Sequence, residues 1–362
     1  MRMLHNPLPC VHKIEGTKNE GEMDLYDYGL STLAQYELTV KSTARTRGAL
    51  LCQTDKGIFI IREFKGSEKK LQKQQELLAR LWEQGCLVDV YIPNKEESLI
   101  SYDKDGIPYT LQQWFQGREC DARSREDVFS SVRTLAKIHK EMHLDLESDY
   151  METSLEDEYR RHNQELKKIR RFIRKKGPSC TFEKEYLKHV EWFLEQAETA
   201  SELLESSSYQ KLREEAKKKG NICHGEYNQH NVLITGQGNA VTGFSHWCYG
   251  IQTGDLYRFM RKILEKSNWN IQTGREMLNT YDRIRSISKE EIENLKIRFS
   301  YPDKFWKLSN YYYTHSKAWV SEKNTEKFQT LIRQKEKWER FCEECFRSVS
   351  YTHLTLPTKL EV

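Results

Sequence analysis

The hydrophobic pattern of this chain changes once, near Gly117, and that change constrains the fold more than any single motif. Before Gly117, strand-like alternation recurs in short segments that turns separate. Beyond it, apolar residues return almost throughout at the three- and four-residue spacing of amphipathic helices. We therefore expect an α+β protein in which a small β-rich part precedes a large helical part.

Five strands and one helix are predicted in the β-rich part. The strands are expected at residues 36–40, 48–53, 58–64, 98–102 and 108–114, with turns at 55–57 and 103–106. The helix is expected at 68–85, because four leucines share one face and Gly85 is a common helix terminator. This order, β-β-β-α-β-β, predicts a small antiparallel sheet with one helix packed on it.

Long amphipathic helices are predicted in the rest of the chain. They are expected at residues 126–142, 155–176 and 182–206, and again from 255 to about 347, with two short strands around a turn at 236–239 as the exception. The chain thus divides into an N-terminal extension (1–30), a β-rich part (31–117) and a helical part (118–347). Residues 348–362 abruptly lose the charge density of the preceding helix and resemble a translated sequencing adapter, so we expect them outside the fold.

Composition excludes several classes of protein. The 58 Lys and Arg residues nearly balance the 54 Asp and Glu residues, and no apolar run is long enough for a membrane span. Residues 1–16 lack the pattern of a secretory signal. A basic run at 167–176 is interpreted as a solvated helix face that turns Ile169, Phe172 and Ile173 to the core. A docking surface for an acidic or phosphate-rich partner is the alternative, and nucleic acid is not expected.

The nine cysteines show no disulfide framework. Their number is odd and their spacing irregular, which indicates reduced thiols in a cytosol-like compartment. Cys342 and Cys345 form a CxxC pair, but no second pair accompanies it. A metal or redox role for that pair is therefore not the favoured interpretation.

One segment carries the chemistry of the chain, Cys223–Ile234, with the sequence CHGEYNQHNVLI. It resembles the catalytic loop HGDxxxxN of aminoglycoside and choline phosphotransferases. Upstream, Leu135–His139 is similar to that family's LAxLH helix, and downstream Phe244 precedes Asp255 by the family's IDF-to-DL spacing. The three motifs stand in the family's order, and the resemblance covers roughly residues 30–345. It implies a bilobal protein-kinase-like fold, with the β-rich part as N-lobe and the helical part as C-lobe.

The resemblance also implies a catalytic set for ATP and Mg²⁺. In this family the loop acid accepts the substrate's hydroxyl proton, and the Asn five residues later holds a metal ion. The matching positions here are Glu226, with His224 in the loop frame, and Asn231 as the metal ligand. On the third strand Arg62 stands in for the lysine that grips the phosphates, with Lys65 as the lesser alternative. Its helix partner is Glu76, with Glu68 as a competitor.

Two departures argue against catalysis. Gly243 occupies the position of the metal-binding IDF aspartate, and glycine has no side-chain ligand for a metal that requires octahedral oxygens. Glu226 is one methylene longer than aspartate, which moves its oxygens by about an ångström, and misplacement on that scale costs on the order of 10²-fold in rate. These departures predict a pseudokinase.

Each of these residues also has a structural interpretation. Glu226 and Asn231 hold the loop by hydrogen bonds, and His224 packs in it and bonds to the backbone. Asp255 follows Gly254 and is expected to be the N-cap of a helix over 256–265. The segment 247–249, Trp-Cys-Tyr, is expected to fill the space of an unused metal site.

A closer resemblance extends over most of the chain. The segments CHGEYNQHNVL and GFSHWCYGIQTGDLYRFMRKILEKSNWN are similar to CotS-type spore coat proteins of endospore-forming Firmicutes. This implies a protein made in the mother-cell cytoplasm and assembled into the spore coat with other coat proteins. A structural component without phosphotransfer is the first hypothesis. An ATP-dependent kinase for the hydroxyl of a small molecule or polysaccharide is the second, and a nucleotide-binding pseudokinase switch is the third.

Overall fold

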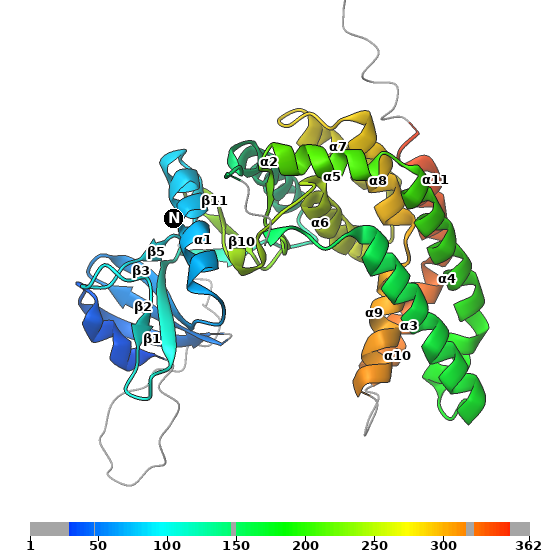
Figure 1. The fold of residues 1–362 in the computed structure, drawn as a ribbon, viewed down its shortest axis with the longest axis horizontal. Helices are drawn as coiled ribbons and strands as arrows, with labels where there is room; N and C mark the ends of the chain where they lie inside the picture. The colour runs from blue at the N-terminus through cyan, green and yellow to red at the C-terminus, as the bar shows by residue number, and fades with distance from the viewer. Residues whose placement is uncertain (1–28, 47, 146–149, 316–321, 348–362) are drawn as a thin grey trace, which may run out of the picture. The chain divides into compact units, whose positions relative to one another are not determined.

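The computed structural model describes residues 29–46, 48–145, 150–315 and 322–347, which form two compact units (Figure 1). The first unit comprises the described residues up to Glu119 together with Val232–Ser245, and the second comprises Cys120–Asn231 and the residues from His246 onward. The chain is thus an α+β protein, as predicted. The predicted boundary at 117 placed 232–245 in the helical part, whereas these residues belong to the first unit. Most of the expected N-terminal extension and all of 348–362 lie outside the described residues.

The first unit is built around an antiparallel sheet with the strand order β1-β2-β3-β7-β5, to which β6 adds beside β7. Its strands are β1 (Val40–Thr46), β2 (Ala49–Thr54), β3 (Gly57–Glu63), β5 (Tyr91–Ile92), β6 (Ser101–Tyr102) and β7 (Pro108–Gln113). Apolar residues of β2, β3 and β7 form one core with two residues from the 3₁₀ segment Leu30–Gln35 and its end, Leu33 and Tyr36. The sheet therefore has a buried face that the sequence pattern predicted.

Helix α1 (Glu68–Glu83) confirms the predicted helix. The Ser67 side chain accepts a hydrogen bond from the Lys70 amide and caps the first turn. Four leucines of one face are buried, and Gly85 follows the helix with φ of 77°. The Gln75 side chain bonds to the Tyr91 backbone, which attaches the helix to the end of the sheet.

The first strand was predicted in the wrong place. We expected it at 36–40, but β1 begins at Val40 and continues through the basic residues to Thr46. Tyr36 instead lies buried against the sheet. The side chains of β1 are mostly exposed, because it is an edge strand, so no alternation of apolar residues marked it.

A second small sheet completes the first unit. It has the order β4-β11-β10-β8, where β4 (Leu87–Val88) runs parallel to β11 (Gly238–Val241), and β10 (Val232–Thr235) pairs with β11 and with β8 (Gly117–Glu119). The hairpin of β10 and β11 was predicted. It brings Gly243, two residues after β11, into the first unit.

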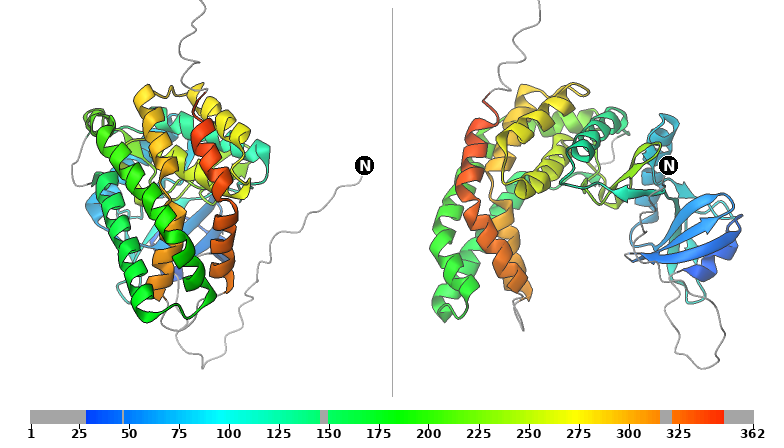
Figure 2. Two further views of the ribbon diagram at one scale, coloured as in Figure 1. Left: turned by 90° about the vertical axis from the view of Figure 1, so that its right-hand side faces the viewer. Right: turned by 180° about the vertical axis from the view of Figure 1, so that it is seen from behind.

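The second unit is helical. Its helices are α2 (Arg125–Glu141), α3 (Leu155–Lys176), α4 (Thr181–Ser206), α5 (Tyr209–Lys218), α6 (Thr253–Lys266), α7 (Ile271–Asp282), α8 (Lys289–Ser300), α9 (Asp303–His315), α10 (Glu322–Arg333) and α11 (Lys335–Glu344), and a short pair joins β9 (Ile222–Cys223) to β12 (Cys248–Tyr249). In Figure 2, α3 and α4 lie side by side, with α9 and α10 next to them. Within the described residues, no helix combines the length and apolarity of a membrane span.

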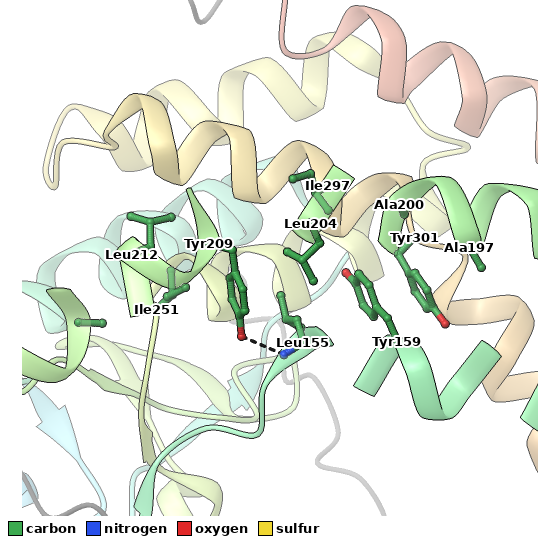
Figure 3. Close-up of a cluster of buried hydrophobic side chains, with 11 residues drawn as sticks. Leu155, Tyr159, Ala197, Ala200, Leu204, Tyr209, Leu212, Ile251, Ile297 and Tyr301 are labelled. Atoms are coloured by element: carbon green, nitrogen blue, oxygen red, sulfur yellow. Dashed lines mark hydrogen bonds between the residues drawn. The ribbon is translucent and has the colours of Figure 1, made fainter. Parts of the chain in front are cut away.

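A hydrophobic cluster joins the ends of these helices (Figure 3). Leu155 and Tyr159 at the start of α3 pack with residues of α4, α5 and α8. The Tyr159 ring stacks on Tyr301, with 3.7 Å between ring centroids. The Tyr209 hydroxyl accepts the Leu155 backbone N–H at 2.9 Å, so the first turn of α3 is fixed where it meets the core.

Acidic residues of α4 pair with the basic run of α3. Arg170 and Arg174 both bond to Glu191, and Lys176 bonds to Glu183. The expected burial of Ile169 and Ile173 is confirmed, but Phe172 is 46% exposed and was wrongly assigned to the core. The charges of this run therefore link α3 to α4, which neither interpretation had included, and a docking surface stays a prediction.

Candidate functional site

The loop after β9 is held in place by one buried carboxylate, Asp255 on α6. Its two oxygens accept the backbone N–H groups of His224, at 2.6 Å, and of Gly225, at 3.0 Å. Asp255 was predicted to cap the helix 256–265. That prediction is wrong, because α6 already begins at Thr253 and the Asp255 side chain turns away to the loop.

Asp255 is ionised despite its burial. Burial alone would raise its pKa, but a hydrogen bond from His139, at 3.3 Å, and the charge of Arg258, also at 3.3 Å, bring the pKa to about 2. The other nitrogen of His139 bonds to the Tyr281 hydroxyl at 2.7 Å. The histidine of the LAxLH motif, His139, therefore orients the Asp255 carboxylate that binds the loop backbone.

Local geometry of the loop depends on His224 and Gly225. The His224 side chain is buried, and its Nδ1 accepts the Glu226 backbone N–H at 3.2 Å, which is the backbone bonding expected of it. Gly225 has φ of 82°, and a Cβ there would lie 1.9 Å from the His246 carbonyl oxygen. Only glycine fits this close approach.

The Glu226 side chain is on the surface of the loop. It is about half exposed (53%), and its Oε2 lies 3.5 Å from Nε2 of His246. Its carbonyl oxygen accepts the side-chain amides of Asn228 and Asn231, each at 2.9 Å. The amide nitrogen of Asn231 is thereby engaged, whereas Oδ1 is the atom through which an asparagine binds a metal ion.

In the first unit, Gly243 has a partner of its own. It has φ of 82°, and its backbone N–H donates to Oδ2 of Asp89 at 2.9 Å. Asp89 is fully buried, and Nη1 of Arg62 lies 3.8 Å from the same oxygen. Burial raises the pKa of Asp89 to about 6, although the charge of Arg62 and the Gly243 N–H oppose the shift.

The expected pair of Arg62 and Glu76 is not formed. Glu76 is exposed and pairs with Lys73 at 2.9 Å on the same helix. Arg62 instead lies between Asp89 and the side chain of Gln112, to which it donates at 3.2 Å, and its guanidinium lies over the Trp114 ring. The structural reason is that the carboxylate facing β3 comes from the segment between β4 and β5 and not from α1.

Asp89 was missed in the sequence analysis. Its signal is an acidic residue inside the apolar run Leu87-Val88-Asp89-Val90-Tyr91, since a carboxyl group in such a run is buried only with a partner. Without a tertiary structure nothing indicated that this partner is Arg62.

No ready metal centre is present in the parts of the chain described. No group of three or more His, Cys, Asp or Glu side chains there is arranged to hold a metal ion. Burial raises the pKa of both CxxC thiols, to about 12 for Cys345, and Sγ of Cys342 points to the Phe299 carbonyl at 3.4 Å. Position 243 offers no side-chain oxygen, so the residues present do not fit the Mg²⁺ set of the kinase-like family.

Trp247 and Tyr249 are both buried, in an edge-to-face contact with 5.7 Å between centroids. They belong to the helical unit, where Cys248 of β12 pairs with Cys223 of β9. That these side chains fill the space of a metal site stays a prediction.

The loop borders a cavity that lies wholly within the helical unit. The cavity has a volume of about 350 Å³, and Gly225–Asn228 form one side of it. Helices α3 and α6, Arg298 near the end of α8, and the residues around the start of α9 supply the rest of its wall. Sequence analysis did not predict it, because its walls come from segments more than 140 residues apart.

Comparison with known proteins gives the following matches. The family model described as "Spore coat putative kinase YutH" matches residues 31–345. Spore coat protein S of Bacillus subtilis is 22% identical over 169 residues, which are 46% of this chain and 48% of that protein. The chain therefore spans about half the length of this curated relative.

Solved structures with a similar fold are phosphotransferases. An aminoglycoside phosphotransferase from Alicyclobacillus acidocaldarius matches with a TM-score of 0.80 and 16% identity, over 92% of this chain and 99% of that one. Spectinomycin phosphotransferase, solved with ADP and spectinomycin, matches with a TM-score of 0.59 and 10% identity, over 88% and 99% of the two chains. At these identities the likeness shows the fold, which confirms the predicted kinase-like architecture.

Proposed function

The chain belongs to the YutH family of kinase-like spore coat proteins, and from that membership we propose that it is a coat component whose kinase-like fold serves as an assembly scaffold without transferring phosphate. In this role it is made in the mother-cell cytoplasm and then takes its place among other coat proteins. The similarity to Spore coat protein S supports the same setting.

The observation that carries the proposal is the environment of Gly243. The position has no side-chain oxygen, and its backbone N–H is engaged by the buried carboxylate of Asp89. Phosphoryl transfer relies on metal ions that neutralise the charge of the β- and γ-phosphates. A site that lacks its principal carboxylate ligand does not support that chemistry.

The other charged positions support the same proposal. Arg62 is engaged by Asp89, Gln112 and the Trp114 ring, which leaves it less available to a phosphate than an extended lysine. Glu226 is longer than the family's aspartate and lies beside His246. Each of these changes alone weakens catalysis. Together they favour a kinase-like fold that is kept as an assembly scaffold.

A second candidate function is nucleotide binding without catalysis. It is favoured by the intact geometry of the loop. Asp255 accepts two backbone N–H groups of the loop, and the Asn231 side-chain amide donates to the Glu226 carbonyl. The spectinomycin phosphotransferase of the same fold was solved with ADP. Retained loop geometry is compatible with a bound nucleotide that acts as a structural switch.

A thermal-shift titration of the full chain with ATP, with and without Mg²⁺, tests both candidates. A ligand at about 100 times its Kd adds about 2.7 kcal/mol of stability, which corresponds to a shift of roughly 5–10 °C in a unit of this size. The scaffold role predicts no shift under either condition. A shift that needs no metal supports the second candidate, and a shift that requires Mg²⁺ refutes the scaffold proposal.

A further inference from the structure

The cavity beside Gly225–Asn228 contains hydrogen-bond donors that the protein itself does not use. Its polar wall is rich in cations: Arg161, Arg258, Arg261, Lys262, Arg298 and Lys307 line it, against the acids Glu158, Glu226 and Asp303. All of these residues belong to the helical unit, so the cavity is a property of that unit alone.

Arg298 supplies the first free donor. Its side chain is 3% exposed, and its Nε donates to Asn294 at 2.8 Å. Its Nη2 has no hydrogen-bond partner among the described residues, and the Glu152 carboxylate is 3.8 Å away. A buried guanidinium nitrogen without an acceptor is costly, so a site of this kind calls for an acceptor from outside the chain.

His162 supplies the second. Its Nε2 lies 3.3 Å from Nη2 of Arg161, and an arginine can only donate, so Nε2 is the acceptor. Burial lowers the pKa of His162 to about 4, hence the ring is neutral at pH 7 and its proton is on Nδ1. This Nδ1 is buried and has no partner within the described part of the chain.

Two further cations of the wall have no ion pair among the described residues, Lys262 on α6 and Arg161 on α3. Burial and the neighbouring charge of Arg261 lower the pKa of Lys262, whereas the charges of Glu226 and Glu265 oppose the shift. The remaining cations are neutralised within the protein. Arg258 bonds to Glu152, and both Arg261 and Lys307 pair with Asp303.

The acids of the wall do not cancel this excess. Asp303 is the one used by Arg261 and Lys307, and Glu226 lies beside His246. Burial and the charge of Glu152 raise the pKa of Glu158, whereas the charges of Arg258 and Arg298 lower it. Six cations therefore face three acids in this wall, and a ligand in the cavity meets mainly hydrogen-bond donors and positive charge.

Aromatic rings form the apolar part of the wall. Tyr159, Tyr257, Tyr301 and Trp306 line the cavity, and the stacked pair of Tyr159 and Tyr301 is visible in Figure 3. An apolar wall with a few convergent polar groups is typical of small-molecule sites, and the volume of about 350 Å³ lies within their range.

We propose that this cavity binds a small anionic sugar, whose carboxylate or phosphate is held by Arg298, Lys262 and Arg161 and whose ring lies against the tyrosines. The free donors call for an acceptor, and the unpaired cations select a negative charge. The inference does not depend on the scaffold role or on nucleotide binding, because every residue it uses lies in the helical unit and none is needed to hold ATP.

Isothermal titration calorimetry on the full chain, in low salt and without nucleotide or metal, tests this inference. The test compounds are D-glucuronate and glucose 6-phosphate as anions, glucose as the neutral control and glucosamine as the cationic control. We expect binding of at least one anion, weakened by added salt, and the two anions distinguish a carboxylate from a phosphate. Neither anion binding up to about 10 mM, or glucosamine binding as well as the anions, would overturn the proposal.

Two variants locate the binding. Lys262→Gln and Arg161→Gln each remove a cation that forms no ion pair within the described part of the chain, so we expect the folded chain to persist, and its melting temperature checks this. Each is expected to weaken anion binding by about tenfold or more, since a hydrogen bond to a charged group is lost. Lys337→Gln, on the exposed surface of α11, removes the same charge outside the cavity and should bind like the wild type. Equal affinity in all variants would overturn the assignment.

Discussion

Replacing Asp255 by Asn should destabilise the helical unit by about 2.5 kcal/mol at pH 7. The pKa of this carboxyl falls from its usual 3.8 to about 2 in the folded chain. At 1.36 kcal/mol for each pH unit, that difference is about 2.5 kcal/mol of stability that belongs to the ionised form. The two backbone N–H groups of His224 and Gly225 bond to different oxygens of Asp255, and an asparagine replaces one of those oxygens by an NH₂ donor, so one N–H loses its acceptor.

Thermal unfolding followed by circular dichroism measures this effect. For a unit of about 150–250 residues each kcal/mol changes the midpoint by about 2–4 °C, so a decrease of roughly 5–10 °C is expected. Asp157→Asn is the matched control, because Asp157 is 62% exposed and, among the residues that the structure describes, pairs only with Arg160 of the same helix. Its midpoint should stay within about 1–2 °C of the wild type, since exposed pairs contribute little.

The sign of the pH dependence provides a second check. Because the folded pKa of Asp255 is below its unfolded value, the stabilisation is complete above about pH 4 and is lost as the pH falls toward 2. Asp255→Asn should lack this component. Equal midpoints for the variant and the wild type at pH 7 would refute the idea that this carboxylate holds the loop.

Two further perturbations have definite expected outcomes. Gly225→Ala should lower the free energy of unfolding by at least about 2 kcal/mol in a urea titration, because a Cβ would meet the His246 carbonyl at 1.9 Å with φ of 82°. Gly236→Ala, with open space around it, is the control and should be close to neutral. Asp89 has a pKa of about 6 in the fold, so the wild type should lose about 3 kcal/mol as the pH rises from about 3 to about 7. Asp89→Asn should lack that loss, and an identical pH profile in both proteins would contradict the assignment.

Periodicity alone predicted most of the helices. The spacing of apolar residues placed a helix at 155–176 and another at 182–206, and the structure has Leu155–Lys176 and Thr181–Ser206. Each of these helices buries one apolar stripe, and the periodic spacing of apolar residues predicts such a stripe. The edge strand β1 was misplaced because its side chains are mostly exposed, so no pattern of buried apolar residues marked it.

The candidate site was predictable only in part. The loop residues 224–231 and the glycine at 243 were recognised because they are contiguous motifs of a known family. The distant side chains that hydrogen-bond to those residues were not recognised. Asp255 was taken for a helix cap, and Asp89 was not noticed, because each acts on a segment far away in the chain.

The sequence by itself determined the α+β composition, the catalytic-loop motif and the absence of a carboxylate at position 243. All three follow from residue identity and local spacing. The tertiary structure alone decided that Asp89 faces Arg62 and that donors of Arg298, His162 and Lys262 meet around one cavity. The physical reason is that charge pairing and cavity walls depend on which distant segments pack together, and burial of the apolar stripes sets that packing before any polar group finds its partner.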